Sequence, residues 1–286
     1  MISADKPFDM EQKLKDLEMI KNEYASYYSC LRADELQPSK IIIGSNLTIK
    51  KNDAGEKVIL LYQSRLIILK NINESVTKHI IEYSDINYII NEGMPNPSCL
   101  IIEYGSDGKE EILYDSKAYS IVNSLLSDLR SFTVANPKVG AVENISDDVF
   151  SELKENKYIG ASIAKKALLD NNVIICSLKQ RRIYDRVWWI LRKAVTQNHF
   201  TIICNNEIVI FLEKCNTKRQ WFTSGDLIFI PIKTLKCTSI EVTGKGMIMR
   251  YLFHSDRKYE LFYENERTDE LLKIMAFING RITDGN

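Results

Sequence analysis

The chain of 286 residues passes twice through one succession of sequence patterns, and this repeat limits its fold more than any other feature. Each copy has strand-like runs, then a Ser-Asp turn, a charged strand and a helix with one apolar face. The matched segments are KVILLYQSRLIILKN with FTIICNNEIVIFLEK, and SCLIIEYGSDGKEEILYDSKAYSIVNSLLSDLR with GMIMRYLFHSDRKYELFYENERTDELLKIMAFINGR. A long self-match of this kind is typical of a duplicated structural unit.

Strand-like periodicity begins at Lys40, where runs rich in Ile, Val, Leu and Tyr alternate with turn signals such as Ser106-Asp107-Gly108. We expect an antiparallel meander that ends in a helix, with Asp115 or Ser116 as its N-cap. The predicted apolar face of this helix consists of Tyr119, Val122, Leu125, Leu126 and Leu129. The second copy predicts a matching helix over TDELLKIMAFINGR.

The first copy resembles the bacterial pleckstrin-homology-like and GRAM-like families, in which a turn-Arg-Leu hairpin precedes a strand entered through an acidic-Ile step. Those positions are Ser64-Arg65-Leu66 and Asp85-Ile86 in this sequence. The resemblance implies an α+β fold of two tandem pleckstrin-homology-like antiparallel β-barrels, each capped by a C-terminal helix. It implies no particular lipid, because neither closing helix carries the family's tryptophan and the first hairpin lacks a clear basic signature.

Four segments follow from these patterns. Residues 1–37 form an N-terminal amphipathic helix, 38–133 the first domain, 134–196 a helical linker region and 197–286 the second domain. The boundary falls in TVANPKVGAVE, which contains Pro and Gly and has no hydrophobic period. In the linker we expect helices from Ser146 to Leu153, from Ile159 to Leu169 and from Leu178 to Val195.

The last of these predicted helices is strongly basic. At about 100° per residue its apolar residues gather on one face, and its basic residues surround a tryptophan on the other. This candidate surface for an anionic partner consists of Lys179, Arg181, Arg182, Arg186, Trp189, Arg192 and Lys193. Anionic lipid headgroups, a phosphate backbone and an acidic protein all suit it, and so does a structural position between the two barrels.

No pattern in the sequence indicates catalysis. The three histidines lie outside HxxxH or HxH spacing, and phosphate-binding glycine loops and a GxSxG elbow are missing. The acidic residues Glu103, Glu110 and Glu111 are expected on the solvated face of a half-buried sheet. We therefore assign no catalytic, cofactor-binding or metal-binding residues and expect a non-enzymatic protein.

Composition narrows the expected partners and compartment. Thirty-eight basic residues balance 38 acidic ones, so no global field draws the chain to nucleic acid, which is an unlikely partner by this argument. The N-terminus lacks the basic flank and apolar core of a signal peptide, and six dispersed cysteines suit reduced thiols, so we expect a cytoplasmic protein. The predicted function is binding or scaffolding through a protein partner or self-association; the alternative is peripheral binding to an anionic membrane.

Overall fold

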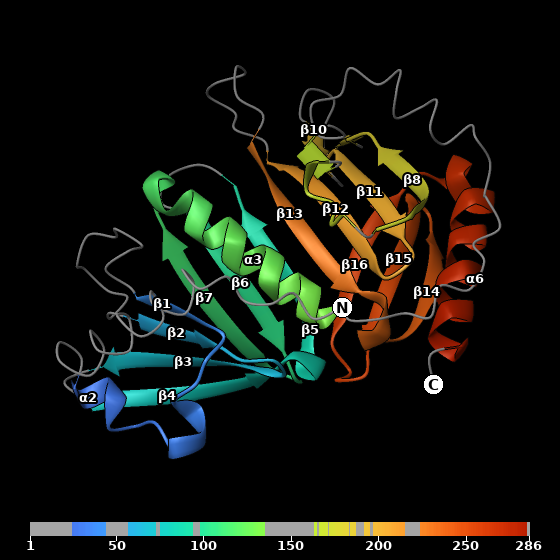
Figure 1. Ribbon diagram of the computed structural model, residues 1–286. Helices are drawn as coiled ribbons and strands as arrows, with labels where there is room; N and C mark the ends of the chain where they lie inside the picture. Colours follow the sequence, from blue (N-terminus) through green and yellow to red (C-terminus); the bar gives the residue numbers. More distant parts are fainter. Residues whose placement is uncertain are drawn as a thin grey trace.

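The computed structural model describes residues 25–43, 57–72, 75–93, 98–134, 163–164, 166–170, 172–182, 184–186, 192–194, 197–214 and 224–284. Within these ranges the protein is built mainly of antiparallel strands, with one long helix in each half (Figure 1). Of the predicted N-terminal helix over residues 1–37, residues 25–37 lie inside the described ranges. Only α2 (Ala25–Tyr28) is α-helical there, and the prediction is wrong for the residues after it, which form a turn and a 3₁₀ turn at Ala33–Glu35.

The first half contains two runs of strands and then a helix. Its elements are β1 (Lys40–Ile43), β2 (Lys57–Leu61), β3 (Arg65–Ile72), β4 (Ser75–Glu82), β5 (Ile86–Glu92), β6 (Ser98–Tyr104), β7 (Gly108–Tyr114) and α3 (Tyr119–Thr133). Strands β1 to β4 form one sheet in chain order, and a 3₁₀ turn at Tyr83–Asp85 leads the chain into β5.

The second half repeats this order of elements. It consists of β8 (Ile174–Gln180), β9 (Tyr184–Arg186), β10 (Arg192–Ala194), β11 (His199–Cys204), β12 (Glu207–Lys214), β13 (Ser224–Pro231), β14 (Leu235–Thr243), β15 (Gly246–Phe253), β16 (Lys258–Tyr263) and α6 (Thr268–Asp284). The short pair β9 and β10 is additional, since it lies between the first and second strands of the repeated order.

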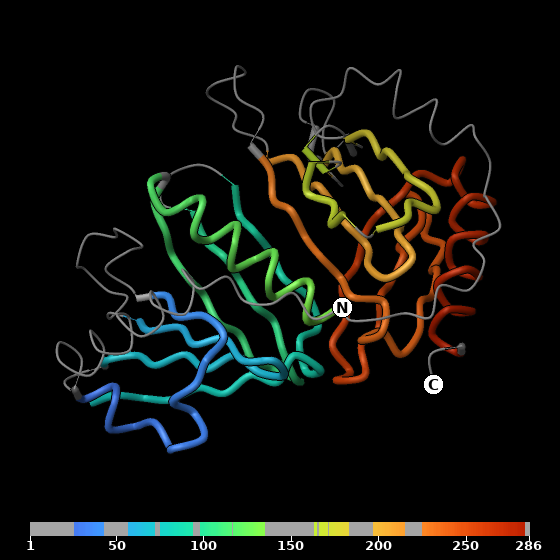
Figure 2. The backbone as a smooth tube through the Cα atoms, in the orientation of Figure 1, coloured from blue at the N-terminus to red at the C-terminus, as the bar shows by residue number. Residues whose placement is uncertain are grey.

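The expected pair of closed barrels is wrong, because none of the sheets formed by the described residues closes on itself. Strand β13 of the second half pairs with β5 of the first, from Asp226 opposite Glu92 to Phe229 opposite Ile89. This pairing creates a seven-stranded sheet in the order β7-β6-β5-β13-β12-β11-β8, flanked by the sheets β1-β2-β3-β4 and β14-β15-β16. The edge of β5 thus obtains its hydrogen bonds from β13 of the other half. The strands of the first half therefore do not need to close into a barrel to satisfy this edge. Figure 2 shows the two halves side by side along this junction.

Both faces of the seven-stranded sheet are buried along its central strands, whereas Lys109 and Glu111 of the edge strand β7 are exposed. One face joins a core that contains residues of both halves, among them Leu100, Ile102, Phe200 and Phe229. The other face packs beneath β14 to β16 and α6. Nearly continuous apolar runs such as HFTIIC in β11 suit a strand that is covered on both sides.

The two Ser-Asp turns of the repeat meet near this junction. The hydroxyl of Ser255 donates to Oδ1 of Asn87 over 2.8 Å, and Nε of Arg257 donates to the carbonyl of Ser106 over 2.6 Å. Arg257 also forms an ion pair with Glu103. The turns that mark the repeat in the sequence therefore also fasten its two copies together.

Helix α3 confirms the predicted first closing helix, and α6 confirms the second, although neither caps a barrel. Val122, Leu125 and Leu129 are fully buried, while Tyr119, predicted on the same face, is 56% exposed. Asp115, one of the two predicted N-caps, accepts hydrogen bonds from the backbone N–H groups of Lys117 and Ala118 and so caps the 3₁₀ turn Ser116–Ala118 that leads into α3. The N-cap of α3 itself is Ala118, which has no side-chain capping bond.

The predicted basic helix from Leu178 to Val195 is wrong. Residues Ile174–Gln180 form strand β8, which pairs antiparallel with β11, and β9 and β10 follow as a short ribbon. The ladder with β11 satisfies the backbone, and consecutive residues of β8 from Ile175 to Leu178 are buried, which overrides the helical spacing seen in the sequence. In the second predicted helix, residues 163, 164 and 166 are helical; the first, from Ser146 to Leu153, lies outside the described residues.

Candidate functional site

The sequence-predicted basic surface is spread along a β-ribbon and its base. Lys179 lies in β8, Arg181 and Arg182 directly follow it, Arg186 lies in β9, and Arg192 and Lys193 lie in β10. Trp189 lies outside the described residues. The structure therefore brings Arg186, Arg192 and Lys193 together, but by strand pairing and not as the face of a helix.

The register of this ribbon places like charges opposite each other. Arg192 pairs with Arg186, and Lys193 pairs with Asp185. The ribbon's base is held by Asn198, which accepts the backbone N–H of Arg182 over 2.6 Å and donates to Glu213 over 2.6 Å.

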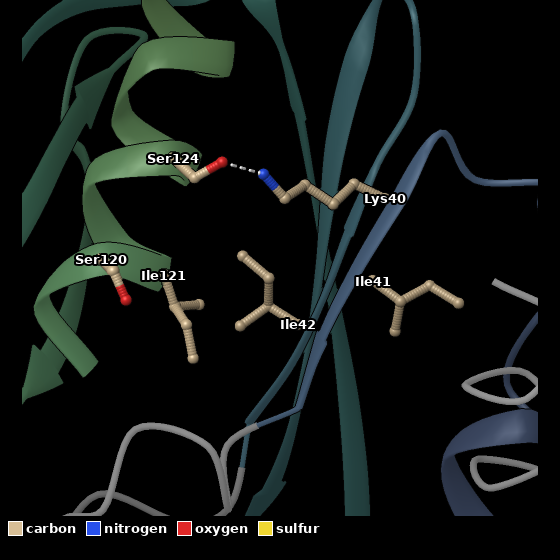
Figure 3. A pocket seen from close by; sticks show the side chains of 6 residues that line it. All are labelled: Lys40, Ile41, Ile42, Ser120, Ile121 and Ser124. Atoms are coloured by element: carbon tan, nitrogen blue, oxygen red, sulfur yellow. Dashed lines mark hydrogen bonds between the residues drawn. The ribbon is translucent and has the colours of Figure 1, made fainter. Parts of the chain in front are cut away.

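A first pocket lies between the edge strand β1 and helix α3, and we call it the β1–α3 groove (Figure 3). Its volume is about 340 Å³, and its lining residues are Lys40, Ile41, Ile42, Ser120, Ile121 and Ser124. In Figure 3, Ile42 of β1 and Ile121 of α3 point toward each other, whereas Ile41 points to the opposite side of the strand. The groove thus has apolar walls with serine hydroxyls along the helix.

Lys40 connects the two sides of this groove. Its ammonium donates to the hydroxyl of Ser124 over 2.5 Å and forms an ion pair with Asp128 at 2.6 Å. Both charged partners are about one third exposed, so this ion pair contributes little to the stability of the fold. Because Lys40 is the first residue of β1, its contacts with Ser124 and Asp128 of α3 limit the groove at that end of the strand.

Strand β1 is an edge strand. It pairs with β2 through Lys40 opposite Leu61 to Ile43 opposite Val58, and it has no second strand partner in the described part of the chain. The unpaired edge of a strand presents backbone N–H and C=O groups in a row. Such an edge beside an apolar groove is the geometry in which sheets accept a further strand.

A second pocket lies on the other side of α3, and we call it the α3–β13 cavity. Its volume is about 370 Å³. Its apolar walls come from Leu126, Ile163, Leu168, Leu227 and Phe229, and its polar lining from Asn91, Tyr119, Asn123, Ser127, Arg130 and Lys166. Helix α3 thus separates two pockets, and only its third face is packed into the core.

Arg130 forms the floor of the α3–β13 cavity. It is almost fully buried and makes a two-pronged ion pair with Glu207, while its Nη1 donates to the carbonyl of Ala167 over 2.6 Å. Its guanidinium carbon lies 3.9 Å from the ring centroid of Phe229. Asn172 donates to the same carboxylate. These contacts tie α3 to β12, to Ala167 and to Asn172.

A buried polar cluster around Glu110 lies inside the first half. The prediction that Glu110 lies on the solvated face of the sheet is therefore wrong. This residue is 1% exposed, and its Oε1 lies 2.6 Å from Nζ of Lys70 and 3.2 Å from Nδ1 of His79. Its Oε2 has no hydrogen-bond partner among the described groups. Glu111, the next residue, is exposed as predicted. Within the described ranges, no three His, Cys, Asp or Glu side chains gather as metal ligands.

Neither pocket was predicted from the sequence. The signal for them was present in α3, where Ser120 and Ser124 recur at a spacing of four, as do Tyr119, Asn123 and Ser127. Such rows mark two polar sides of a helix that is apolar on a third. The surfaces that these two rows face are formed by β1 and β13. The positions of those strands cannot be predicted from the spacing of residues along the helix.

Comparison with known proteins adds no assignment. No protein-family model matches the chain, and no curated protein matches it significantly. In the part of the chain that the structure describes, no helix has the length and apolar character needed to cross a membrane.

Proposed function

We propose that the protein is a non-catalytic binding module that takes up an extended segment of a partner protein in the β1–α3 groove. The observation that carries this proposal is the combination of an unpaired strand edge with an apolar groove at the same place. The partner segment would add to β1 through backbone hydrogen bonds and place alternate side chains against Ile42 and Ile121.

The protein's own second half supports this mode of binding. Strand β13 adds to the edge of β5 and passes α3 on its other side, where Phe229 contacts Arg130. An extended segment beside α3 is therefore already accommodated once in this fold. The β1–α3 groove offers the same two components, a strand edge and the side of the same helix.

The chemistry of the groove indicates which segment would fit. Lys40 is already paired with Asp128, so the groove has little net charge to attract an ion. Its walls are isoleucines, and Ser120 and Ser124 offer hydroxyl groups at the rim. A segment with alternating apolar and small polar residues suits this surface, because every second side chain of a strand faces the same side.

The test is a selection of peptides from a displayed library with the purified full-length chain. We expect extended, alternating peptides that lose at least tenfold in affinity when Ser124→Trp fills the groove. The control is Ser131→Trp, an equally exposed serine of α3 that lines neither pocket. Failure to enrich peptides, or peptides that bind Ser124→Trp as tightly as the unchanged chain, would contradict the proposal. Peptides derived from β1 to β4 of this chain would point to self-association.

A second candidate function, contact with an anionic membrane surface, is favoured by the arginine pair of the ribbon. Arg186 and Arg192 lie opposite each other, and Lys193 and Arg182 are close in sequence. Each basic residue near an anionic surface contributes about 1 kcal/mol. The five residues that connect the two strands, Val187 to Leu191, are all apolar in sequence.

Flotation with neutral and anionic vesicles tests this candidate. Binding to anionic vesicles at low salt, lost in Arg186→Glu with Arg192→Glu, would support it. The matched control replaces the exposed Lys117 and Lys273 by glutamate, which changes the net charge equally at other places. Equal loss in both double variants would indicate a nonspecific charge effect, and absence of binding would exclude the membrane.

A further inference from the structure

The α3–β13 cavity has the size and composition of a small-molecule site. Its volume of about 370 Å³ lies within the range of about 300–1,000 Å³ that ligand pockets usually have. Its lining comes from α3 and β5 of the first half, from β13 of the second half, and from residues 163 and 166–169. Ligand sites often occupy such junctions, because side chains from separate elements converge there.

One side chain that lines this cavity offers it a hydrogen-bond donor. Asn91 is 6% exposed, and its Oδ1 accepts the hydroxyl of Tyr114 over 2.6 Å. Burial raises the pKa of Tyr114 to about 12, so the phenol stays protonated and remains the donor. Since Oδ1 is occupied by Tyr114, the amide Nδ2 is the part of the Asn91 side chain that can donate to a ligand oxygen or to water in the cavity.

The cavity also carries one uncompensated positive charge among its described lining residues. Arg130 is neutralised by Glu207 in a buried ion pair. Lys166, at the exposed rim, has no carboxylate partner in the described ranges. A ligand with one negative charge would balance this lysine, and its charge would remain near solvent.

The remaining walls determine the shape of the ligand. Leu227 and Phe229 present an apolar surface from β13. Tyr119, Asn123 and Ser127 follow one another at intervals of four residues along α3, so they form a polar row beside that surface. A molecule with an apolar body and one polar edge fits between the row and the strand.

We infer that the α3–β13 cavity binds a small, largely apolar organic anion. Its apolar body contacts Leu227 and Phe229, and its acceptor oxygens take the amide N–H of Asn91 and the ammonium of Lys166. This site is separate from the β1–α3 groove, because it lies on the other side of α3 and shares no lining residue with it.

Fluorescence titration of the full chain with two probes tests the inference. The probes are 1-anilinonaphthalene-8-sulfonate, an apolar monoanion, and N-phenyl-1-naphthylamine, which has nearly the same body without the charge. We expect saturable binding of the anion, about tenfold weaker in Lys166→Glu, whereas the neutral probe changes less than about twofold. Ser127→Trp, which fills the rim, should weaken both probes at least tenfold, and Ser131→Trp should weaken neither.

The two variants also separate binding from unfolding. Lys166 is exposed and unpaired among the described residues, so Lys166→Glu should leave the circular dichroism spectrum unchanged, and it decides the matter if Ser127→Trp fails to fold. Saturable binding that follows this pattern supports the site. Absence of saturable binding, or anion affinities that are equal in the unchanged chain and both folded variants, overturns it.

Discussion

The side-chain amide of Asn279 in α6 takes the place of a neighbouring strand for Thr238 in β14. Its Oδ1 accepts the backbone N–H of Thr238 over 2.7 Å, and its Nδ2 donates to the carbonyl of the same residue over 3.0 Å. The hydroxyl of Thr238 donates to the same Oδ1 over 3.0 Å. One side chain thus satisfies both backbone groups that a further strand would use.

In the first half, the corresponding strand edge obtains its hydrogen bonds from another strand and not from a side chain. Ile89 of β5 and Thr238 of β14 each lie 17 residues before the serine of their Ser-Asp turn, and Arg130 and Asn279 each lie 24 residues after it. Ile89 pairs with Phe229 of β13, and Arg130 lies over the ring of that phenylalanine. The repeated sheet edge is therefore extended by a strand in one half and closed by an asparagine in the other.

Asn279→Leu should expose the edge of β14. We expect a loss of about 1–3 kcal/mol in the free energy of unfolding, because two buried backbone groups lose their partners. We also expect self-association, since a free edge accepts strands of other molecules. Urea denaturation and sedimentation velocity measure both effects. Thr283→Leu, an exposed change on the same helix, is the control, and equal behaviour of the two variants would show that Asn279 does not protect the edge.

The ion pair of Arg130 and Glu207 should be strongly coupled. Removing one partner, as in Arg130→Met or Glu207→Met, leaves a buried charge and should cost about 3–5 kcal/mol. The double variant should lose clearly less than the sum of the two single losses, because it leaves neither charge unpaired. Urea denaturation of the four proteins at pH 7 gives the coupling energy, and additive losses would mean that the pair is not formed in solution.

His199 should make the stability fall in acid. Burial lowers its pKa to about 4; its Nε2–H donates to the carbonyl of Phe262, and its Nδ1 has no partner among the described residues. An unfolded histidine has a pKa of about 6.5, so the folded state disfavours the proton. The stabilising contribution is fully present above about pH 6.5 and is lost as the pH falls toward 4, by up to about 3 kcal/mol.

Urea denaturation between pH 7 and pH 4.5 tests this prediction. His199→Gln should have a flatter stability profile than the unchanged chain, because glutamine can donate to Phe262 and does not titrate. His254→Gln, at an exposed position, is the control and should follow the unchanged chain. Parallel profiles for all three proteins would show that His199 does not contribute to the acid response.

The buried thiols should resist alkylation. Burial raises the pKa of Cys99 to about 11 and that of Cys176 to about 12, and Cys204 is shifted in the same direction. Thiols in this state carry almost no reactive thiolate at pH 8. Timed alkylation with iodoacetamide and peptide mass spectrometry should therefore modify the half-buried Cys30 and Cys237 at least tenfold faster. Equal rates would indicate that the core opens readily.

Local patterns in the sequence were sufficient for several elements. The spacing of three and four between apolar residues predicted α3, and its buried residues Val122, Leu125 and Leu129 follow that pattern. The alternating and apolar runs predicted strands in both halves. The helical pattern from Leu178 to Val195 failed, because pairing of β8 with β11 determines its backbone. Glu110 failed for a similar reason, since Lys70 and His79 come from other strands to meet it.

The sequence by itself determined the order of elements in each half, because helix faces, caps and turns depend on residues close together in the chain. Only the tertiary structure decided that the halves share one sheet, since the pairing of Ile89 with Phe229 joins residues far apart in sequence. The two pockets along α3 depend on how the strands are arranged around this helix. The position of β13 beside the helix creates one of them, and the short edge strand β1 creates the other, so no local pattern could reveal either.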